Sequence, residues 1–475
     1  CHAQTCGKCV PCRVGLLQLQ NLLEQVLDGT ATMDTLALIE ETANNITDSA
    51  DCAIGFEAAH MVLAGLQGCR DDYVYHIEHG KCSYSITQPV PCVALCPAGV
   101  DIPGYIALVG EERYADAVSL IRKDNPFPTA CALICEHPCE ARCRRNMIDS
   151  SVNIRGLKRM AVDNAPANTV PVPPKAPSTG KRIAIAGGGP GGLSAAYYLE
   201  LMGHHAVVFE QKSQLGGMLR YGIPNYRFPR ERLDEDIEAI LSTGVEVHTN
   251  ANIGNGENDI PLSRLREDFD AVYIAIGAHT DKKIGMEGED AQGVISAVEM
   301  LRNIGDGNPP DFTGKRVIVV GGGNVAMDCT RSALRLGASS VGIAYRRRQN
   351  DMTALPEEVE GAIAEGAELY SLKAPVRVEA DEDGNVAALW VQPQIIGPID
   401  AWGRARPVQA DVELKRIPCD IVIVAVGQGI ESRHFEDSGV PVHWGTIEAL
   451  EEASVKDIPG IFRSEEHTSE LQSPN

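Results

Sequence analysis

The chain has 475 residues, of which 44% are hydrophobic and 23% are charged, and its formal net charge at pH 7 is −23. This length is enough for about three domains. The negative charge argues against a nucleic-acid partner, because nucleic acids are bound through Lys and Arg. No apolar run approaches a membrane span and no secretory leader opens the sequence, so we expect a cytoplasmic protein.

The cysteines are concentrated in the first third of the chain. Of 15 cysteines, all but Cys329 and Cys419 lie at or before Cys143. Clustered cysteines without a secretory signal indicate metal or redox chemistry more often than disulfides.

A first cysteine motif opens the chain. Cys6, Cys9 and Cys12 stand in C-x-x-C-x-x-C spacing, and Cys52 follows in the string DCAIG. Three thiolates on a tight loop can bind three corners of an iron–sulfur cubane, and a fourth at a helix start can complete it. Four thiolates also suit a structural zinc ion, so a zinc-bearing scaffold without catalysis is an alternative. Cys1 and Cys69 have no partner spacing.

The strings CGKCVPCRVG and CAIG resemble the C-terminal iron–sulfur domain of the NADH-binding flavoprotein subunit of complex I-type dehydrogenases and related hydrogenases. The resemblance covers a helical domain at residues 1–81 and implies a [4Fe–4S] cluster on Cys6, Cys9, Cys12 and Cys52. In that family an FMN- and NADH-binding part precedes this domain. The chain starts at Cys1 without Met, inside a motif-bearing segment, so we expect it to be a fragment of a longer product.

A second cysteine motif lies within residues 82–163. Its later cysteines repeat every fourth residue in CALICEHPCEARC, which would place them on one face of a regular helix. Pro138 interrupts such a helix, so the pattern predicts a cage of loops and short helices. Arg142, Arg144 and Arg145 beside it offset cluster charge or form a solvated face. The candidate ligands are Cys92, Cys96, Cys131, Cys135, Cys139 and Cys143.

This segment resembles the N-terminal iron–sulfur domain of the glutamate synthase small subunit and of dihydropyrimidine dehydrogenase, through CPAGVDIPGYI, DNPFPTAC, CEHPCEARC and VNIRGLKRMAVD. Two-cluster members carry an extra C-x-x-C upstream of Cys92, where this chain has only Cys82. A ligand is also missing near Lys158, because an ammonium cannot coordinate iron. The resemblance therefore implies one cluster, with Cys131 as its least certain ligand.

The stretch 164–180 is dense in proline and predicts an extended linker. After it, Lys181 to Glu210 follows the order strand, glycine turn, helix, strand and acidic end. Its G-x-G-x-x-G turn allows close approach of a pyrophosphate to the helix start, and Glu210 is placed to accept from a ribose hydroxyl. The residues assigned to this dinucleotide site are Gly187, Gly189, Pro190, Gly191, Gly192 and Glu210.

A glycine turn and an arginine follow in the string QLGGMLRYGIPNYRFP. In the family that it resembles, this string lines the FAD site, which assigns Gly216, Gly217 and Arg227 to the cofactor. A loop that only covers the sheet is the alternative. The predicted strand 271–276 ends at Gly277, where such flavoproteins bring backbone close to FAD. Residues 181–300 form the first part of the predicted FAD-binding domain.

Residues 301–429 repeat this logic as a predicted NADP-binding domain. Gly321, Gly323, Asn324 and Ala326 lie in a G-x-G-x-x-A turn, and the next strand ends in three arginines instead of an acid. Arginines there suit a ribose 2′-phosphate, so Arg346 and Arg347 favour NADPH over NADH; a surface arginine run is the alternative. A later buried strand, 420–426, ends at Gly427.

The order of sites predicts an α/β protein with two Rossmann-like domains of the disulfide reductase type, preceded by α-helical iron–sulfur domains. Residues 430–462 return to the FAD domain, and 463–475 read as a non-native tail. The whole resembles an NADPH-dependent glutamate synthase small-subunit-like flavoprotein. This implies hydride transfer from NADPH (or NADH) to FAD and single electrons passed through [4Fe–4S] clusters to a partner subunit. No catalytic acid or base is assigned.

Three functions are left open by the sequence. An electron-bifurcating, hydrogenase or formate dehydrogenase-type complex is the first, and a glutamate synthase is the second. The zinc-bearing scaffold is the third. The added N-terminal cluster motif argues against a glutamate synthase small subunit proper.

Overall fold

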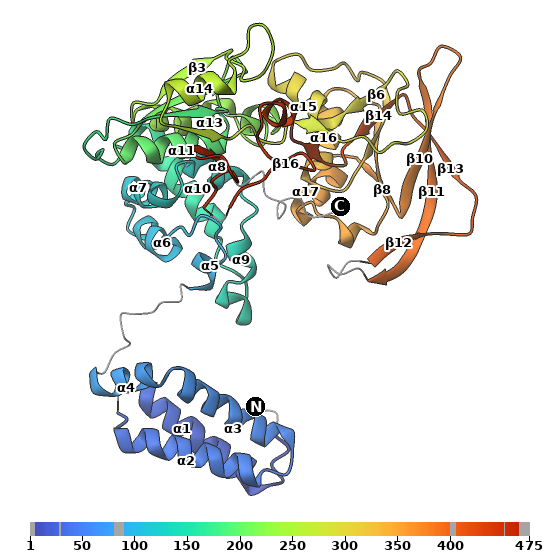
Figure 1. The fold of residues 1–475 in the computed structure, drawn as a ribbon. Helices are drawn as coiled ribbons and strands as arrows, with labels where there is room; N and C mark the ends of the chain where they lie inside the picture. The colour runs from blue at the N-terminus through green and yellow to red at the C-terminus, as the bar shows by residue number, and fades with distance from the viewer. Residues whose placement is uncertain (1–4, 28–29, 80–89, 400–404, 451, 465–475) are drawn as a thin grey trace. The chain divides into compact units, whose positions relative to one another are not determined.

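A computed structural model describes residues 5–27, 30–79, 90–399, 405–450 and 452–464. Cys1, Cys82 and most of the expected tail, 465–475, lie outside these residues. The chain divides into two compact units, Cys1–Val90 and Pro91–Asn475 (Figure 1).

Four helices form the first unit after a π-helical turn, η2 (Pro11–Gly15). Leucines three and four residues apart give the first of them one apolar face, and Leu19, Leu36 and Ile39 are buried in the shared core. Thr32 and Thr35 cap the second helix reciprocally. The helices are α1 (Leu16–Leu27), α2 (Met33–Ser49), α3 (Ala53–Gly68) and α4 (Arg70–His79).

The second unit begins with short helices that carry the second cysteine motif. As Pro138 predicts, no single helix spans this motif: α8 ends at Ile134 and α9 begins at Pro138. The buried side chain of Arg122 donates to the carbonyls of Val170 and Ala167, which fastens the start of the linker to the helices. The helices are α5 (Pro91–Ala94), α6 (Ile102–Gly110), α7 (Tyr114–Asp124), α8 (Pro128–Ile134), α9 (Pro138–Ala141) and α10 (Ile154–Asn164).

The first sheet is parallel, with strand order β18-β4-β1-β2-β3. Its inner strands are apolar runs with both faces covered, as parallel strands require. Helices α11 (Pro190–Leu201) and α13 (Arg230–Leu241) belong to this layer. The strands are β1 (Arg182–Ala186), β2 (His205–Glu210), β3 (Glu246–Thr249), β4 (Ala271–Ile274) and β18 (Ile461–Arg463).

The second sheet is also parallel, in the order β6-β14-β7-β8-β9. Its helices include α15 (Ala297–Gly305), α16 (Asn324–Arg335) and α17 (Pro356–Ala364). The strands are β6 (Val294–Ser296), β7 (Arg316–Val320), β8 (Ser340–Tyr345), β9 (Glu368–Ser371) and β14 (Ile421–Val424).

An antiparallel arm leaves this second sheet domain. Its strands are β10 (Lys373–Ala380), β11 (Val386–Ile399), β12 (Ala405–Gln409) and β13 (Lys415–Pro418), with β10, β12 and β13 all paired to β11 (Figure 1). The fold is thus the predicted pair of Rossmann-like sheets, preceded along the chain by helical segments.

The end of the described chain returns to the first sheet. Strand β18 pairs in parallel with β4, and it includes Arg463, one residue beyond the expected end at Phe462. The backbone N–H of Ser464 donates to the carbonyl of Ile274 at 2.9 Å. Among the residues that the structure describes, no helix combines the length and apolar character needed to cross a membrane.

Candidate functional site

The first glycine turn connects β1 to α11. Gly187 has φ +111°, and a Cβ there would lie 2.3 Å from the carbonyl oxygen of Ala275. A Cβ on Gly192 would lie 2.0 Å from the carbonyl oxygen of Gly187. Glycine is therefore required at both positions by close backbone packing, and the start of α11 is left open to a ligand.

Glu210 ends β2 beside this turn and is 6% exposed. One carboxylate oxygen accepts from the backbone N–H of Gly188 at 2.7 Å, and the other accepts from that of Lys212 at 2.7 Å. These bonds fix the carboxylate while each oxygen keeps a lone pair for a ribose hydroxyl. The end of β2 lies next to the glycine turn, so an acid at this position can accept from the backbone N–H of Gly188.

A cavity of about 500 Å³ opens at the carboxyl ends of these strands. A site in this position is the rule for doubly wound sheets. Of the residues assigned to FAD from the sequence, those that line it are Gly187, Gly189, Pro190, Gly191, Glu210, Gly217 and Gly277. Gly192, Gly216 and Arg227 are not among its lining residues.

The cavity also has polar lining residues that motif analysis missed. They include Lys212, Asn255, Arg302 and His434, which come from distant segments without a motif. The guanidinium of Arg302 donates to the carbonyl of His279 at 2.5 Å. Burial lowers the pKa of His434, and the nearby carboxylates of Glu431, Asp259 and Asp437 act in the opposite direction. The size, the glycine turn and the acid together fit the adenosine and pyrophosphate part of FAD.

The second glycine turn connects β7 to α16 in the same way. Gly321 has φ +149°, and a Cβ there would lie 2.3 Å from the carbonyl oxygen of Ala425. Gly323 precedes helix α16 and Asn324 begins it. Ala326, in the first turn of the helix, is fully buried. Gly427 follows β14 with φ +127°. The turn and helix start fit a second dinucleotide pyrophosphate.

The three arginines after β8 have different surroundings. Arg346 is exposed and Arg347 is 8% exposed. Arg348 binds Asp351 through Nε and Nη2, each at 2.8 Å, which occupies its guanidinium. Arg346 is therefore the arginine best exposed to an incoming 2′-phosphate.

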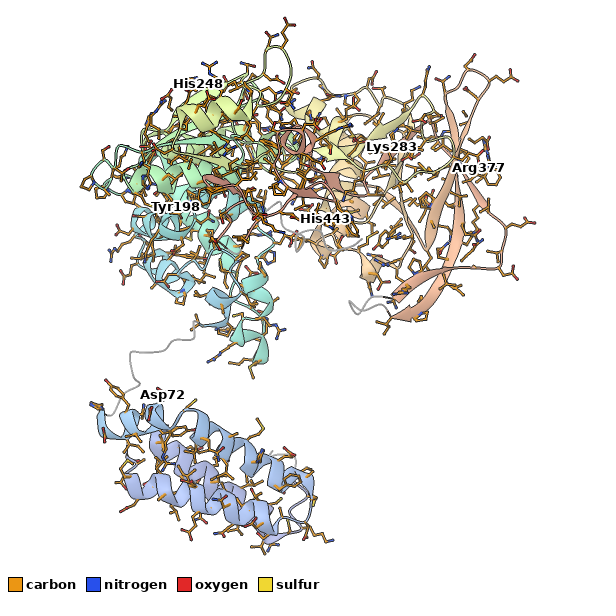
Figure 2. All side chains as sticks on the ribbon, viewed as in Figure 1. Asp72, Tyr198, His248, Lys283, Arg377 and His443 are labelled. Carbon is orange, nitrogen blue, oxygen red and sulfur yellow. The ribbon has the colours of Figure 1, made fainter. Side chains whose placement is uncertain are left out.

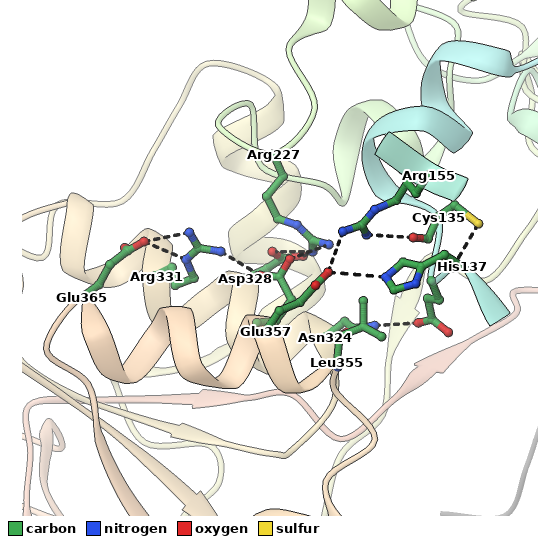
Figure 3. A network of polar contacts seen from close by, with 12 residues as sticks. Cys135, His137, Arg155, Arg227, Asn324, Asp328, Arg331, Leu355, Glu357 and Glu365 are labelled. Atoms are coloured by element: carbon green, nitrogen blue, oxygen red, sulfur yellow. Dashed lines mark hydrogen bonds and ion pairs between the residues drawn. The ribbon is translucent and has the colours of Figure 1, made fainter. Parts of the chain in front are cut away.

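Arg227 lies away from the cavity and joins the two sheet domains (Figure 3). Its Nη1 lies 2.8 Å from both carboxylate oxygens of Asp328 on α16, and its Nη2 lies 3.1 Å from Glu358 on α17. Burial raises the pKa of Asp328 to about 6, and the Arg227 charge acts in the opposite direction. Whether Arg227 also serves FAD remains a sequence-based prediction.

The second cysteine motif contacts the second nucleotide turn directly (Figure 3). The carboxylate of Glu136, next to Cys135, accepts from the Asn324 amide at 2.7 Å. Arg155 on α10 donates to the Cys135 carbonyl at 3.0 Å and to Glu357 on α17 at 2.8 Å. The loop at Cys135 is thus tied to both ends of the 324–357 segment.

The first sheet domain also contacts the cysteine-bearing helices. Asp236 on α13 is fully buried and accepts from the backbone N–H groups of Thr129 and Ala130, at 3.1 and 2.9 Å. These are free donors at the start of α8, which carries Cys131, so Asp236 caps that helix from another domain. Tyr198 on α11 donates to the carbonyl of Lys123 (Figure 2).

In the first unit, three of the predicted ligands, Cys6, Cys9 and Cys52, act on the fourth, the buried Cys12. Burial raises the pKa of Cys12 to about 11, with Cys9, Cys52 and Cys6 as further causes. Backbone donors at Asp51 and Cys12 lower the pKa of Cys9. A Cβ on Gly55 would lie 2.7 Å from the Cys12 sulfur, which explains the glycine in CAIG.

In the second unit, the thiols of the second motif lie near the buried Lys158. Its side chain is 7% exposed, and its charge acts on Cys131 and Cys139. Cys139 also interacts with Cys135 and Cys96, and burial raises its pKa to about 11. Sequence analysis noted Lys158 only as a missing ligand, because a lone lysine in a helix gives no signal of burial.

Several donors point at these sulfurs. The Asn125 amide donates to Cys131 Sγ at 2.9 Å, and the backbone N–H of His137 donates to Cys135 Sγ at 3.3 Å. Among the described residues, no three His, Cys, Asp or Glu side chains are arranged to hold a single metal ion. A cubane has its four thiolates on four separate irons, so its ligands need not meet at one metal ion.

Three family models match residues 1–170 and 181–464 between them. The pyridine nucleotide-disulphide oxidoreductase model matches residues 181–464. The NADH-ubiquinone oxidoreductase-F iron–sulfur binding region matches 1–76, and the dihydropyrimidine dehydrogenase domain II, 4Fe–4S cluster model matches 75–170. These matches confirm the resemblances inferred from the motifs.

Three similar proteins are subunits or chains of NADPH- or NADP(+)-dependent enzymes. The NADPH-Fe(3+) oxidoreductase subunit beta of Geobacter sulfurreducens is 37% identical over 471 residues, covering 95% of this chain and 69% of that protein. The NADP(+)-dependent formate dehydrogenase subunit beta of Moorella thermoacetica is 34% identical over 527 residues, covering 97% and 74%. The glutamate synthase [NADPH] small chain of Escherichia coli K12 is 33% identical over 349 residues, covering 71% and 73%.

A solved structure supports the fold. FprA of Mycobacterium tuberculosis in complex with NADPH aligns with a TM-score of 0.51 at 20% identity, covering 61% of this chain and 78% of that one. Both glycine turns, the cavity at the first and the cysteine motifs agree with these matches. The chain belongs to the pyridine nucleotide-disulphide oxidoreductase family and is an NAD(P)H-dependent oxidoreductase that uses FAD and [4Fe–4S] clusters.

Proposed function

We propose that this chain takes electrons from NADPH at the turn after β7 and delivers them, through FAD and the clusters, to a partner subunit. When bound, FAD accepts a hydride from NADPH and the clusters carry single electrons. The chain's own residues bind and orient these groups and set their electrostatic surroundings. No side chain is assigned as a catalytic acid or base.

One observation carries this proposal: the cysteine-bearing helices are hydrogen-bonded to both sheet domains. Asp236 of the first domain caps α8, and Asn324 of the second binds Glu136. Contacts at 2.7 to 3.1 Å to both nucleotide domains favour electron transfer over a separate structural role for the thiols. A scaffold would need no such contact with a nucleotide turn.

The residues proposed to hold each group follow from their surroundings. Glu210 and the turn at Gly187–Gly192 would hold FAD, and Gly321–Ala326 with Arg346 and Arg347 would hold NADPH. The preference for NADPH is supported by the exposed Arg346 where NAD-specific sites carry an acid. The proposed cluster ligands are Cys6, Cys9, Cys12 and Cys52 in the first unit, and Cys92, Cys96, Cys131, Cys135, Cys139 and Cys143 as candidates in the second.

The test is anaerobic titration of the chain, after assembly with FAD, iron and sulfide, by NADPH and separately by NADH. NADPH should bleach the flavin absorbance and then produce the EPR signals of reduced clusters, at lower concentration than NADH. If neither nucleotide bleaches the flavin, the proposal fails. Zinc in place of iron and acid-labile sulfide would favour the scaffold instead.

The partner is proposed to be an electron-accepting or electron-donating subunit. Support comes from relatives that are named as beta subunits of an NADPH-Fe(3+) oxidoreductase and of a formate dehydrogenase. The clustered thiols would remain reduced in the cytoplasm, which is the proposed compartment. Co-purification from the native source, followed by assays of NADPH oxidation with Fe(3+) and of NADP⁺ reduction with formate, would distinguish these complexes.

A glutamate synthase small subunit is the second candidate, because the small chain of Escherichia coli is 33% identical over 349 residues. The match of residues 1–76 to a different iron–sulfur region favours the first proposal. NADPH oxidation that depends on glutamine and 2-oxoglutarate, with a large partner subunit present, would favour the second.

A further inference from the structure

Lys158 lies in the middle of α10 with its side chain 7% exposed. Within the described residues, Nζ has no carboxylate at ion-pair distance and no hydrogen-bond acceptor. Its one charge contact is the ring of Tyr105, whose centroid is 5.8 Å away. A lysine side chain with so little exposure and no carboxylate partner favours an anion close by.

Cysteines of the second motif lie on the elements packed around this charge, and Cys139, Cys92 and Cys96 share one core cluster with Tyr105 and α10. Helix α10 packs against α8, which carries Cys131, and against α6, which carries Tyr105. Burial raises the pKa values of Cys131 and Cys139, and the Lys158 charge acts against burial at both. Tyr105 in turn interacts with Cys139, Cys96 and Cys92. The ammonium therefore acts on thiols from two separate segments, α8 and α9.

Donors also surround these sulfurs, although the carboxylates of Asp236 and Glu140 act against negative charge on Cys131 and Cys139. Asn125 donates to Cys131 Sγ, the His137 backbone donates to Cys135 Sγ, and Arg155 on the same helix as Lys158 donates to the Cys135 carbonyl. Donors and positive charge together stabilise negative charge on sulfur. The site is thus built for an anionic group that the thiols would share.

We propose that Lys158 is the buried counter-charge of the [4Fe–4S] cluster in residues 91–164 and raises its reduction potential. This inference rests on the cluster assignment made under the proposed function. Reduction adds one electron to the cluster and no proton to Lys158, so the reduced form gains more from the ammonium than the oxidised form. Lys158 acts through the field at the cluster and is a positioning residue, without contact to NADPH.

The test is a redox titration of the assembled chain, monitored by EPR, with wild type and Lys158→Met. Met keeps the length of the side chain and removes the charge, which a buried position tolerates well. The equilibrium constant for reducing this cluster should fall about tenfold, equal to about 60 mV for a one-electron couple. The signal that Cys12→Ser removes belongs to the first unit, and its potential should not change.

Arg159→Met is the matched control, because Arg159 is the next residue of α10 and its side chain is 61% exposed in an ion pair with Asp163. Solvent screens its charge, so the shift should be much smaller. Lys158→Arg should keep the wild-type potential. Lys158→Gln should lower it, which keeps the test decisive if the Met variant assembles poorly.

Unchanged potentials in both the Met and Gln variants would overturn this inference while leaving the proposed function intact. A fall of the same size in Lys158→Arg or Arg159→Met would also overturn it, because the charge at Lys158 would then not be the cause. If the wild type shows no cluster signal from the second unit, the cluster assignment and this inference fail together.

Discussion

The guanidinium of Arg227 and the carboxylate of Asp328 form a largely buried ion pair that joins the two sheet domains. Nη1 lies 2.8 Å from both Asp328 oxygens, and the two side chains are 13% and 6% exposed. Glu358 on α17 binds the same guanidinium at 3.1 Å. The positive charge of Arg227, just before α13, therefore faces two carboxylates, Asp328 on α16 and Glu358 on α17.

Arg227→Ala should destabilise the second unit strongly. It leaves the carboxylate of Asp328 buried without its main partner, and breaking such a pair costs about 3–5 kcal/mol, whereas Glu358 keeps its ion pair with Arg331 at 2.7 Å. Chemical denaturation monitored by fluorescence would measure the loss. Arg264→Ala is the control, since its pair with Asp268 is exposed and is worth at most about 1 kcal/mol. Equal small effects in both variants would contradict the structural role.

Asp236 should make stability depend on pH. Burial raises its pKa to about 7, so the folded state binds this proton more tightly than the unfolded state. Its contribution is fully present below about pH 4 and is lost as pH rises through about 7, a total of about 4 kcal/mol. Asp236→Asn should flatten this part of the stability profile. Asp268→Asn, an exposed carboxyl on α14 (Leu262–Asp268), should leave the profile unchanged.

Arg346→Ala should weaken NADPH binding about tenfold, or about 1.4 kcal/mol, by removing a charge from the 2′-phosphate site. NADH lacks that phosphate, so its dissociation constant should not change. Arg348→Ala is the control because Asp351 already binds its guanidinium. Equilibrium binding to the oxidised wild type and both variants measures the dissociation constants of NADPH and NADH. Equal loss of NADH and NADPH affinity would show that Arg346 does not select the phosphate.

Glu136→Gln should tighten binding of NADP⁺ and NAD⁺ by the same factor, about three- to tenfold. The Glu136 carboxylate lies on Asn324 at the start of α16, where the pyrophosphate of either nucleotide would compete with its charge. Gln keeps the hydrogen bond and removes the repulsion. Adenosine 2′-monophosphate, which lacks the pyrophosphate, should bind both forms equally. Weaker dinucleotide binding in the variant would refute this competition.

Gly55→Ala should reduce the iron and acid-labile sulfide bound by the first unit. Its Cβ would lie 2.7 Å from both the Cys12 sulfur and the Ala50 Cβ, and Cys12 cannot retreat because it lies within η2. Gly65→Ala is the control on the same helix, since its nearest atom is the Tyr73 hydroxyl at 3.9 Å. That change should be neutral or stabilise α3 by up to about 1 kcal/mol. Full cluster content in Gly55→Ala would contradict the predicted contact.

The sequence alone was sufficient for the parts of this protein that depend on neighbours along the chain. Apolar runs predicted the strands β1, β2, β7, β8 and β14, and Pro138 predicted the break between α8 and α9. The glycines at 187 and 321 were recognisable because the turns after those strands need φ values that only glycine adopts readily. Cysteine spacing identified both iron–sulfur segments, because several ligands of one cluster lie close together along the chain.

Tertiary structure alone decided what the remaining charges do. Arg227 was assigned to the flavin from its place in a string, yet its partners lie about a hundred residues away on α16 and α17. Asp236 caps a helix of the cysteine segment, and Lys158 is buried among thiols. No local pattern encodes these pairings, because a charged side chain in a helix looks the same whether it faces water or a neighbouring domain. Only packing removes it from water and so determines its partner and its energy.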